Sequence, residues 1–104
     1  MKKISISLLV SVSMLSTSCV AQDATSLAKK KACFGCHQID TKLIGPAYKD
    51  IAAKYKDDKN AETALATKIR RGSSGVWGAA VMPPNPQVNE EEARALVKWI
   101  LSQK

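Results

Sequence analysis

The stretch Cys33-Phe34-Gly35-Cys36-His37 decides the fold of this chain. It is a C-x-x-C-H motif, the attachment pattern for haem c. Two thiols three residues apart at a helix end lie on one side, where both can form thioethers with the vinyl groups of one haem edge. The next residue, His37, then directs its imidazole towards the iron. The motif therefore predicts one covalently bound haem c, with His37 as an axial ligand.

Two other chemistries also use closely spaced cysteines. A redox-active dithiol belongs in a thioredoxin-like βαβ context, and no alternating run here is long enough for a convincing strand. It would require both thiols to titrate as free groups. A structural zinc site needs four Cys or His ligands, whereas the chain beyond residue 21 has only Cys33, Cys36 and His37. Haem attachment is the prediction that these observations favour.

A second axial ligand must come from another residue type, because His37 is the only histidine. Met82 is the only methionine beyond residue 14, and it lies in the Gly- and Pro-rich segment 72–88. Methionine is ordinarily a flexible filler of hydrophobic cores, and that is the alternative. Neighbouring prolines stiffen the backbone, so a thioether held at the iron has little conformational entropy left to lose. We therefore predict Met82 as the second axial ligand.

The N-terminus has the pattern of a secretory signal peptide. A basic start precedes a mostly apolar run from Ile4 to Leu15, and Cys19-Val20-Ala21 fits the small-x-small cleavage pattern. The run is shorter than the roughly 20 residues that span a bilayer, although a membrane-anchoring or buried helix is the alternative. We predict a signal peptide over residues 1–21 and a mature domain over residues 22–104, without stable membrane insertion. Lipid attachment at Cys19 is a second possibility, which would change location but not chemistry.

Length and charge describe a small basic domain. The chain has 104 residues, 45% of them hydrophobic and 24% charged, which is a globular composition. Without residues 1–21 the chain would have 83 residues, a size that often needs a disulfide, metal or cofactor for stability. The formal net charge is +7, or +5 without the two lysines of the signal peptide. We expect most basic residues to be solvated, and those near the haem edge to steer the protein to acidic or mixed redox partners. Nucleic acid is not an expected partner of an exported chain.

Apolar periodicity and capping residues predict short helices joined by turns. The expected helices are Ser26–Ala32 with Thr25 or Ser26 as N-cap, Pro46–Tyr55, Ala61–Arg71 with Asn60 as N-cap and Gly72 as stop, and a last helix that begins with a capping box of Asn89 and Glu92. No helix or strand is expected in residues 72–88. A structureless loop of this length is unusual in a compact domain unless it wraps something. The predicted fold class is all-α, with four to five short helices around one haem.

Beyond these motifs, the sequence closely resembles the small class I cytochromes c of bacteria, of the cytochrome c-551 (or c8) type. The likeness covers nearly the whole mature chain. Besides the haem motif, it is carried by Ile44–Tyr55, Gly75–Gly78, Met82–Asn85 and Lys98–Lys104. The resemblance implies the cytochrome c fold, in which the first and last helices cross beside the haem.

The resemblance also implies roles for four residues around the haem. The carbonyl of Pro46 would accept a hydrogen bond from the proximal histidine and fix its ring. Trp77 would pack against the haem and donate towards a propionate, with ordinary core packing as the alternative. Asn85 would form a hydrogen bond near the methionine sulfur. Lys68 stands where the family often has an arginine near a propionate, although lysine lacks the bidentate geometry.

Together these features predict a monohaem electron carrier of the periplasm and not an enzyme, since the sequence offers no catalytic acid, base or substrate pocket. The resemblance implies a donor such as a quinol-cytochrome c reductase. It implies an acceptor such as a nitrite reductase, a terminal oxidase or a cytochrome c peroxidase. We expect a monomer. The alternative is a gas-binding or peroxidatic haem protein with a displaceable sixth ligand.

Overall fold

The computed structural model describes residues 2–3, 7, 9–11 and 23–104. It contains four α-helices and one short 3-10 helix: α1 (Ala24–Lys30), η1 (Cys33–Gly35), α2 (Tyr48–Tyr55), α3 (Ala61–Arg71) and α4 (Glu90–Leu101). Within these described ranges, the only β pairing is an isolated antiparallel bridge between Ser73 and Met82. The predicted all-α class is therefore confirmed.

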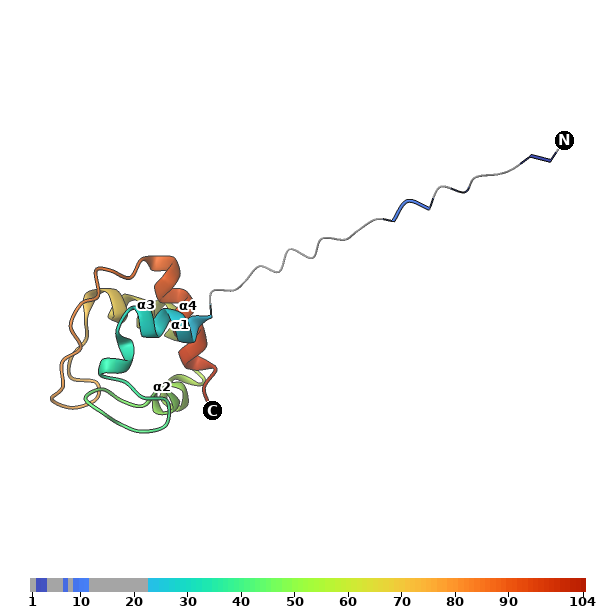
Figure 1. Cartoon of the computed structure of the whole chain (residues 1–104). Helices are drawn as coiled ribbons and strands as arrows, with labels where there is room; N and C mark the ends of the chain where they lie inside the picture. The colour runs from blue at the N-terminus through green and yellow to red at the C-terminus, as the bar shows by residue number, and fades with distance from the viewer. Residues whose placement is uncertain (1, 4–6, 8, 12–22) are drawn as a thin grey trace.

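Helix α4 is the centre of the fold. It packs against α1, α2 and α3, and α2 lies near its C-terminal end (Figure 1). Its buried face consists of Ala93, Leu96, Val97 and Ile100, and the neighbouring Leu101 is partly buried. The core joins this face to buried residues of the other helices and to one residue of the long loop, Val88; the helical residues are Leu27, Ala28, Tyr48, Ile51, Ala66 and Ile69. The haem motif and the long loop are thus arranged around a helical core.

The capping box of α4 and the glycine stop of α3 act as predicted. Asn89 Oδ1 accepts from the Glu92 N–H at 2.8 Å, and Glu92 Oε1 accepts from the Asn89 N–H at 3.0 Å, which completes a capping box. Helix α3 stops at Gly72, whose φ of 86° is a conformation that favours glycine. Asn60 occupies the N-cap position of α3, but its side chain makes no capping hydrogen bond.

The first helix begins and ends earlier than predicted. It starts at Ala24 because Asp23 is the N-cap, and the Asp23 carboxylate accepts from the Thr25 N–H at 3.1 Å and from the Ser26 hydroxyl at 3.3 Å. Neither Thr25 nor Ser26 is the cap. The helix ends at Lys30, and Ala32 takes a left-handed conformation, with φ 63°, that turns the chain into the haem motif.

The second helix begins at Tyr48 and not at Pro46. The preceding residues are hydrogen-bonded to the segment that follows the haem motif: the Gly45 N–H donates to Cys36 O at 2.7 Å, and the Tyr48 N–H donates to Gln38 O at 2.9 Å. Ala47 is therefore extended, with φ −61° and ψ 144°. These contacts between segments override the local helical preference.

The loop of residues 72–88 contains neither helix nor strand, as predicted, apart from the single bridge at its two branches. In Figure 1 it forms the tan-to-orange arc that leaves α3, passes along the left of the domain and returns to α4. In the described ranges, no helix is both long enough and apolar enough to cross a membrane. The predicted signal peptide and Cys19 fall mostly or wholly outside the described residues, so both stay predictions.

Candidate haem-binding site

A cavity of about 460 Å³ lies among the haem motif, α2, α3 and the long loop. Its volume is within the range of about 300–1,000 Å³ that is usual for cofactor and ligand sites. Its lining includes all eight residues singled out from the sequence: Cys33, Cys36, His37, Pro46, Lys68, Trp77, Met82 and Asn85. Apolar side chains of three helices complete the walls, among them Ile51, Leu65 and Ile100. Because protein interiors are otherwise close-packed, a hollow of this size indicates a site for a large apolar group.

The two thiols of the motif stand on one wall of this cavity. Hydrogen bonds from the N–H groups of Cys36 and His37 to Cys33 O, at 3.2 and 3.0 Å, close the turn that presents them. Both cysteines are free and half-buried. Burial raises the pKa of the Cys33 thiol, and its backbone hydrogen bond offsets only part of that effect. Reactive dithiols have lowered pKa values, so this environment argues against a thiol-disulfide site.

Three contacts fix the His37 ring. Nδ1 donates to Pro46 O at 2.7 Å, which leaves Nε2 as the nitrogen available to a metal. The Tyr48 ring stacks on the imidazole with centroids 5.2 Å apart and planes 20° apart. The backbone of Gly45 approaches so closely that a Cβ there would lie 2.6 Å from His37 Cε1 and 2.9 Å from Nδ1. Only glycine fits at that position.

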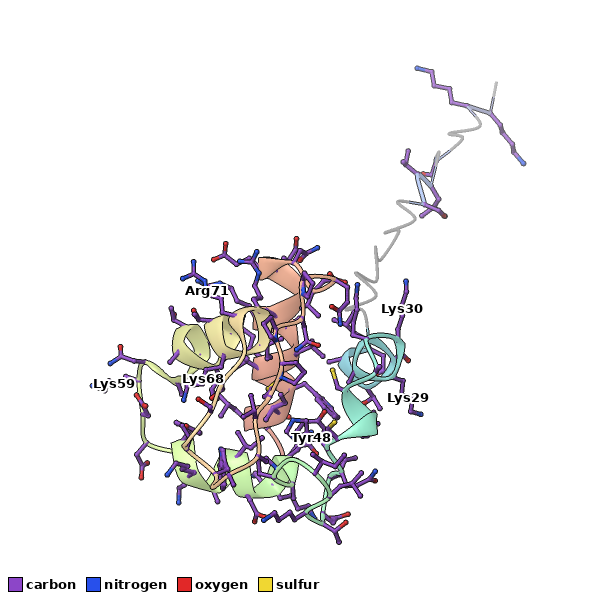
Figure 2. The ribbon with its side chains drawn as sticks, turned by 90° about the vertical axis from the view of Figure 1, so that its left-hand side faces the viewer. Lys29, Lys30, Tyr48, Lys59, Lys68 and Arg71 are labelled. Carbon is purple, nitrogen blue, oxygen red and sulfur yellow. The ribbon has the colours of Figure 1, made fainter. Side chains whose placement is uncertain are left out.

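Tyr48 connects the histidine to the core. It is 2% exposed and packs edge-on against Phe34 and Trp99, at centroid distances of 5.7 and 5.0 Å. Figure 2 shows it in the interior, between α2 and the haem motif. Burial raises the pKa of its hydroxyl well above the usual range. This role and that of Gly45 are not predicted from the sequence, although Gly45 directly precedes Pro46 and Tyr48 follows two residues after it.

Met82 is tied to the end of α3 by its own backbone. The Ser73 N–H donates to Met82 O at 3.0 Å, and the Met82 N–H donates to Ser73 O at 2.8 Å. Gly72 allows this approach, because a Cβ there would lie 2.8 Å from Met82 O. The residue is partly buried and packs against the core. These bonds hold the methionine backbone beside the cavity, whereas a simple core filler needs no such anchoring.

Asn85 joins the long loop to the end of α3. Its Nδ2 donates to Ile69 O at 2.9 Å and to Pro83 O at 3.2 Å, which uses both amide hydrogens. Its backbone N–H also donates to Ile69 O, at 3.2 Å. In this structure Asn85 braces the loop against α3; its hydrogen bond near the Met82 sulfur stays a prediction.

Trp77 and Lys68 lie at the rim of the cavity, each beside another charged or polar side chain. Lys54 Nζ lies 5.5 Å from the centroid of the Trp77 ring, a cation–π distance. Lys68 Nζ lies 3.5 Å from the Tyr55 hydroxyl. Lysine ammonium groups are thus available near the cavity mouth, where an anionic substituent of a cofactor could meet them.

The lining suits an iron porphyrin. Two thiols and an imidazole are grouped at one side, a thioether-bearing loop borders the cavity, and the remaining walls are mainly apolar. Among the described residues, no group of three or more His, Cys, Asp or Glu side chains could hold a metal ion without such a cofactor. A tetrahedral zinc site is therefore not formed by these residues.

Known proteins resemble this chain in sequence and in fold. Residues 21–104 match the sequence model of the cytochrome c family. The chain is 50% identical to cytochrome c-551 of Pseudomonas aeruginosa over 99 residues, which is 95% of this chain and 94% of that protein. It is 57% identical to cytochrome c-552 of Nitrosomonas europaea over 84 residues, or 81% and 82% of the two chains.

The fold comparison agrees with the sequence. The crystal structure of wild-type Nitrosomonas europaea cytochrome c552 matches with a TM-score of 0.75 at 57% identity, covering 77% of this chain and 99% of that one. The predicted resemblance, fold class and cofactor are confirmed. The chain belongs to the cytochrome c family, whose members bind one covalently attached haem c.

Proposed function

We propose that this chain is a one-electron carrier of the periplasm, with Cys33 and Cys36 as the thioether donors and His37 and Met82 as the axial ligands. Its relatives are small c-type cytochromes of an electron-carrying family. One observation supports this assignment of ligands. A single cavity is lined by both cysteines and the histidine of the motif and also by Met82, the only methionine beyond residue 14.

The protein's contribution is to hold two different ligands in place. Haem c, when bound, supplies an iron that gains and loses one electron. The hydrogen bond from His37 Nδ1 to Pro46 O fixes the tautomer and makes Nε2 a better donor. A neutral thioether from Met82 favours the reduced state and raises the potential relative to two nitrogen ligands. Because both ligands are braced by backbone hydrogen bonds, little rearrangement accompanies a change of charge.

The surface around the cavity mouth supports docking of redox partners. Lys42 and Lys68 belong to the lining, and so do the exposed apolar side chains of Ile44 and Val81. Positive charge steers an acidic or mixed partner, and apolar contact lets it approach closely. We propose a quinol-cytochrome c reductase as donor and a nitrite reductase, terminal oxidase or cytochrome c peroxidase as acceptor. Electron-transfer rates with such partners should fall as salt rises.

Export is supported by the N-terminal pattern, a basic start followed by a short apolar run and Cys19-Val20-Ala21. The intact mass of the protein matured in a bacterial periplasm tests this part. Cleavage after Ala21 predicts a mature chain that begins at Gln22 and carries one haem. A mass that includes diacylglycerol on Cys19 would replace the proposed free carrier with a lipid-anchored one.

The axial ligands are tested with carbon monoxide. The visible spectrum of the reduced wild-type holoprotein should not change when the gas is added, because both axial positions are held. The Met82→Ala variant should bind the gas and have a lower reduction potential. Val81→Ala, which trims an exposed neighbour in the same loop, is the matched control and should behave as the wild type.

Two results would contradict the assignment. An unchanged potential in Met82→Ala would show that another group is the ligand. A shifted spectrum in the wild type would mean an open or displaceable sixth position, and the gas-binding or peroxidatic function would then be favoured.

A further inference from the structure

A second hollow, of about 230 Å³, lies between α3 and α4 and shares no lining residue with the haem cavity. Arg70 and Arg71 reach it from the last turn of α3, and Arg94 reaches it from α4. Thr63 and Thr67 also belong to the lining, where the Thr67 hydroxyl donates to Thr63 O at 3.0 Å. The proposed electron transfer uses none of these groups.

The charges of this hollow are not balanced by the protein. Glu90 is the only acidic residue of the lining, and its Oε1 lies 3.4 Å from Arg94 Nη2. Strong charge-assisted hydrogen bonds are shorter, about 2.7–2.9 Å. In the part of the chain that the structure describes, neither Arg70 nor Arg71 forms an ion pair. Three cations therefore face one carboxylate, which leaves an excess of two positive charges.

A second carboxylate orients Arg94 from outside the lining. Glu62 Oε1 lies 3.8 Å from Arg94 Nη1, but Glu62 also faces Lys98 Nζ at 3.9 Å, so it is shared between two cations. Glu90 and Glu62 thus position Arg94, but at 3.4 and 3.8 Å they do not fully satisfy its hydrogen-bond donors. Its remaining N–H donors, with those of the two unpaired arginines, are available to a ligand.

We propose that this hollow, defined by Arg70, Arg71, Arg94, Thr63 and Thr67, binds a tetrahedral oxyanion of the phosphate class. Guanidinium groups present planar pairs of donors that match phosphate oxygens. A dianion neutralises the excess charge of the lining. The volume is small and concave, which suits a hydrated inorganic ion or a single phosphate group better than the flat surface of a partner protein.

The test is a titration of the isotopically labelled holoprotein with inorganic phosphate, at ionic strength held constant with sodium chloride. The nuclear magnetic resonance signals of the arginine Nε–H groups report binding directly. We expect saturable shifts for the three arginines of the hollow. In Arg70→Gln/Arg71→Gln the affinity should fall at least tenfold.

The matched control is Lys29→Gln/Lys30→Gln, which removes the same amount of charge from exposed positions of α1. Figure 2 shows these lysines on the opposite side of the view from Arg71. We expect less than a twofold change in affinity for this control. The unfolding midpoints of both variants, followed by circular dichroism, establish that each remains folded.

Three outcomes would overturn the proposal. Shifts that do not saturate, or an equal loss of affinity in the two variants, would mean that phosphate responds only to the overall positive charge. Saturable binding to phosphatidylglycerol vesicles through Arg70 and Arg71, without saturable binding of free phosphate, would replace the inorganic ion with a lipid headgroup.

Discussion

The most direct test of how the proximal histidine is positioned is to replace Gly45 with alanine. The new Cβ would lie 2.6 Å from His37 Cε1, 2.9 Å from Nδ1 and 3.0 Å from Nε2. To restore an ordinary contact of 3.4 Å, the ring must move by about 0.8 Å. The stacked Tyr48 ring, itself buried, opposes such a movement. The histidine therefore cannot relax without disturbing its other contacts.

The size of the effect follows from two losses. Adding a methyl group to a filled site lowers the free energy of unfolding by about 1–3 kcal/mol. Displacing the ring also lengthens the 2.7 Å hydrogen bond to Pro46 O, whose net contribution is about 0.5–1.5 kcal/mol. We expect Gly45→Ala to lower the free energy of unfolding by about 2–4 kcal/mol.

The assay is guanidinium chloride unfolding of the oxidised holoprotein, with the free energy obtained by linear extrapolation. Gly35→Ala is the matched control, because it lies in the haem motif and a Cβ there has nothing within 4 Å. The His37 Nδ1–H resonance should shift in Gly45→Ala only. If both variants were equally stable and that resonance stayed in place, the steric argument would be refuted.

Three further changes examine the helix ends. Asn89→Ala removes the acceptor that lies 2.8 Å from the Glu92 N–H and should lower the free energy of unfolding by about 1 kcal/mol, measured by the same titration; no loss would contradict the cap. The Asn89 N–H and then Lys31 hold the pKa of the Glu92 carboxyl below its usual value, so its stabilising effect is present above pH 4.5 and is lost as the pH falls through the lowered pKa. Glu92→Gln should therefore weaken the acid dependence of stability, and an identical pH profile would argue against this linkage. Gly72→Ala places a side chain at φ 86° and a Cβ 2.8 Å from Met82 O. We expect it to lower the free energy of unfolding by about 1–3 kcal/mol and to reduce the absorption band of the proposed methionine–iron bond. A full band at unchanged stability would count against the role of the Ser73–Met82 bridge.

Features with local signals could be predicted from the sequence. The capping box of α4 depends on two side chains three residues apart, and the stop of α3 depends on a glycine that can take positive φ. The haem motif is likewise local, since its three reactive groups lie within five residues. In each case the residues that form the feature are neighbours in the chain.

Features that depend on contacts between distant segments could not be predicted from the sequence. The start of α2 is displaced because Gly45 and Tyr48 bond to the backbone after the haem motif, and no periodicity reveals those partners. The close packing of Gly45 against His37 is equally invisible in a list of residue types. The hydrogen bond from Asn85 to Ile69 O is a further example, because its acceptor lies 16 residues earlier, on α3.

The N-terminal cap of α1 shows a different limit. Asp23, Thr25 and Ser26 are all suitable caps by residue type, and the sequence analysis chose between the last two. In the structure Asp23 accepts hydrogen bonds from both of the others. The choice among adjacent candidates depends on the backbone angle at which the helix enters the fold.

The bridge between Ser73 and Met82 bears on which part of the native protein opens most readily. Two amides and two carbonyls join the branches of a loop whose side chains are largely exposed, whereas α4 is embedded in the core on its whole inner face. Opening the loop exposes little apolar surface, so it belongs to the low-energy end of the native fluctuations, well below global unfolding. In hydrogen–deuterium exchange the Ser73 and Met82 amides should therefore exchange in a sub-global step, long before those of Leu96 and Val97. With Met82 as the proposed ligand, its sulfur could detach and return in such a step while the four helices stay assembled.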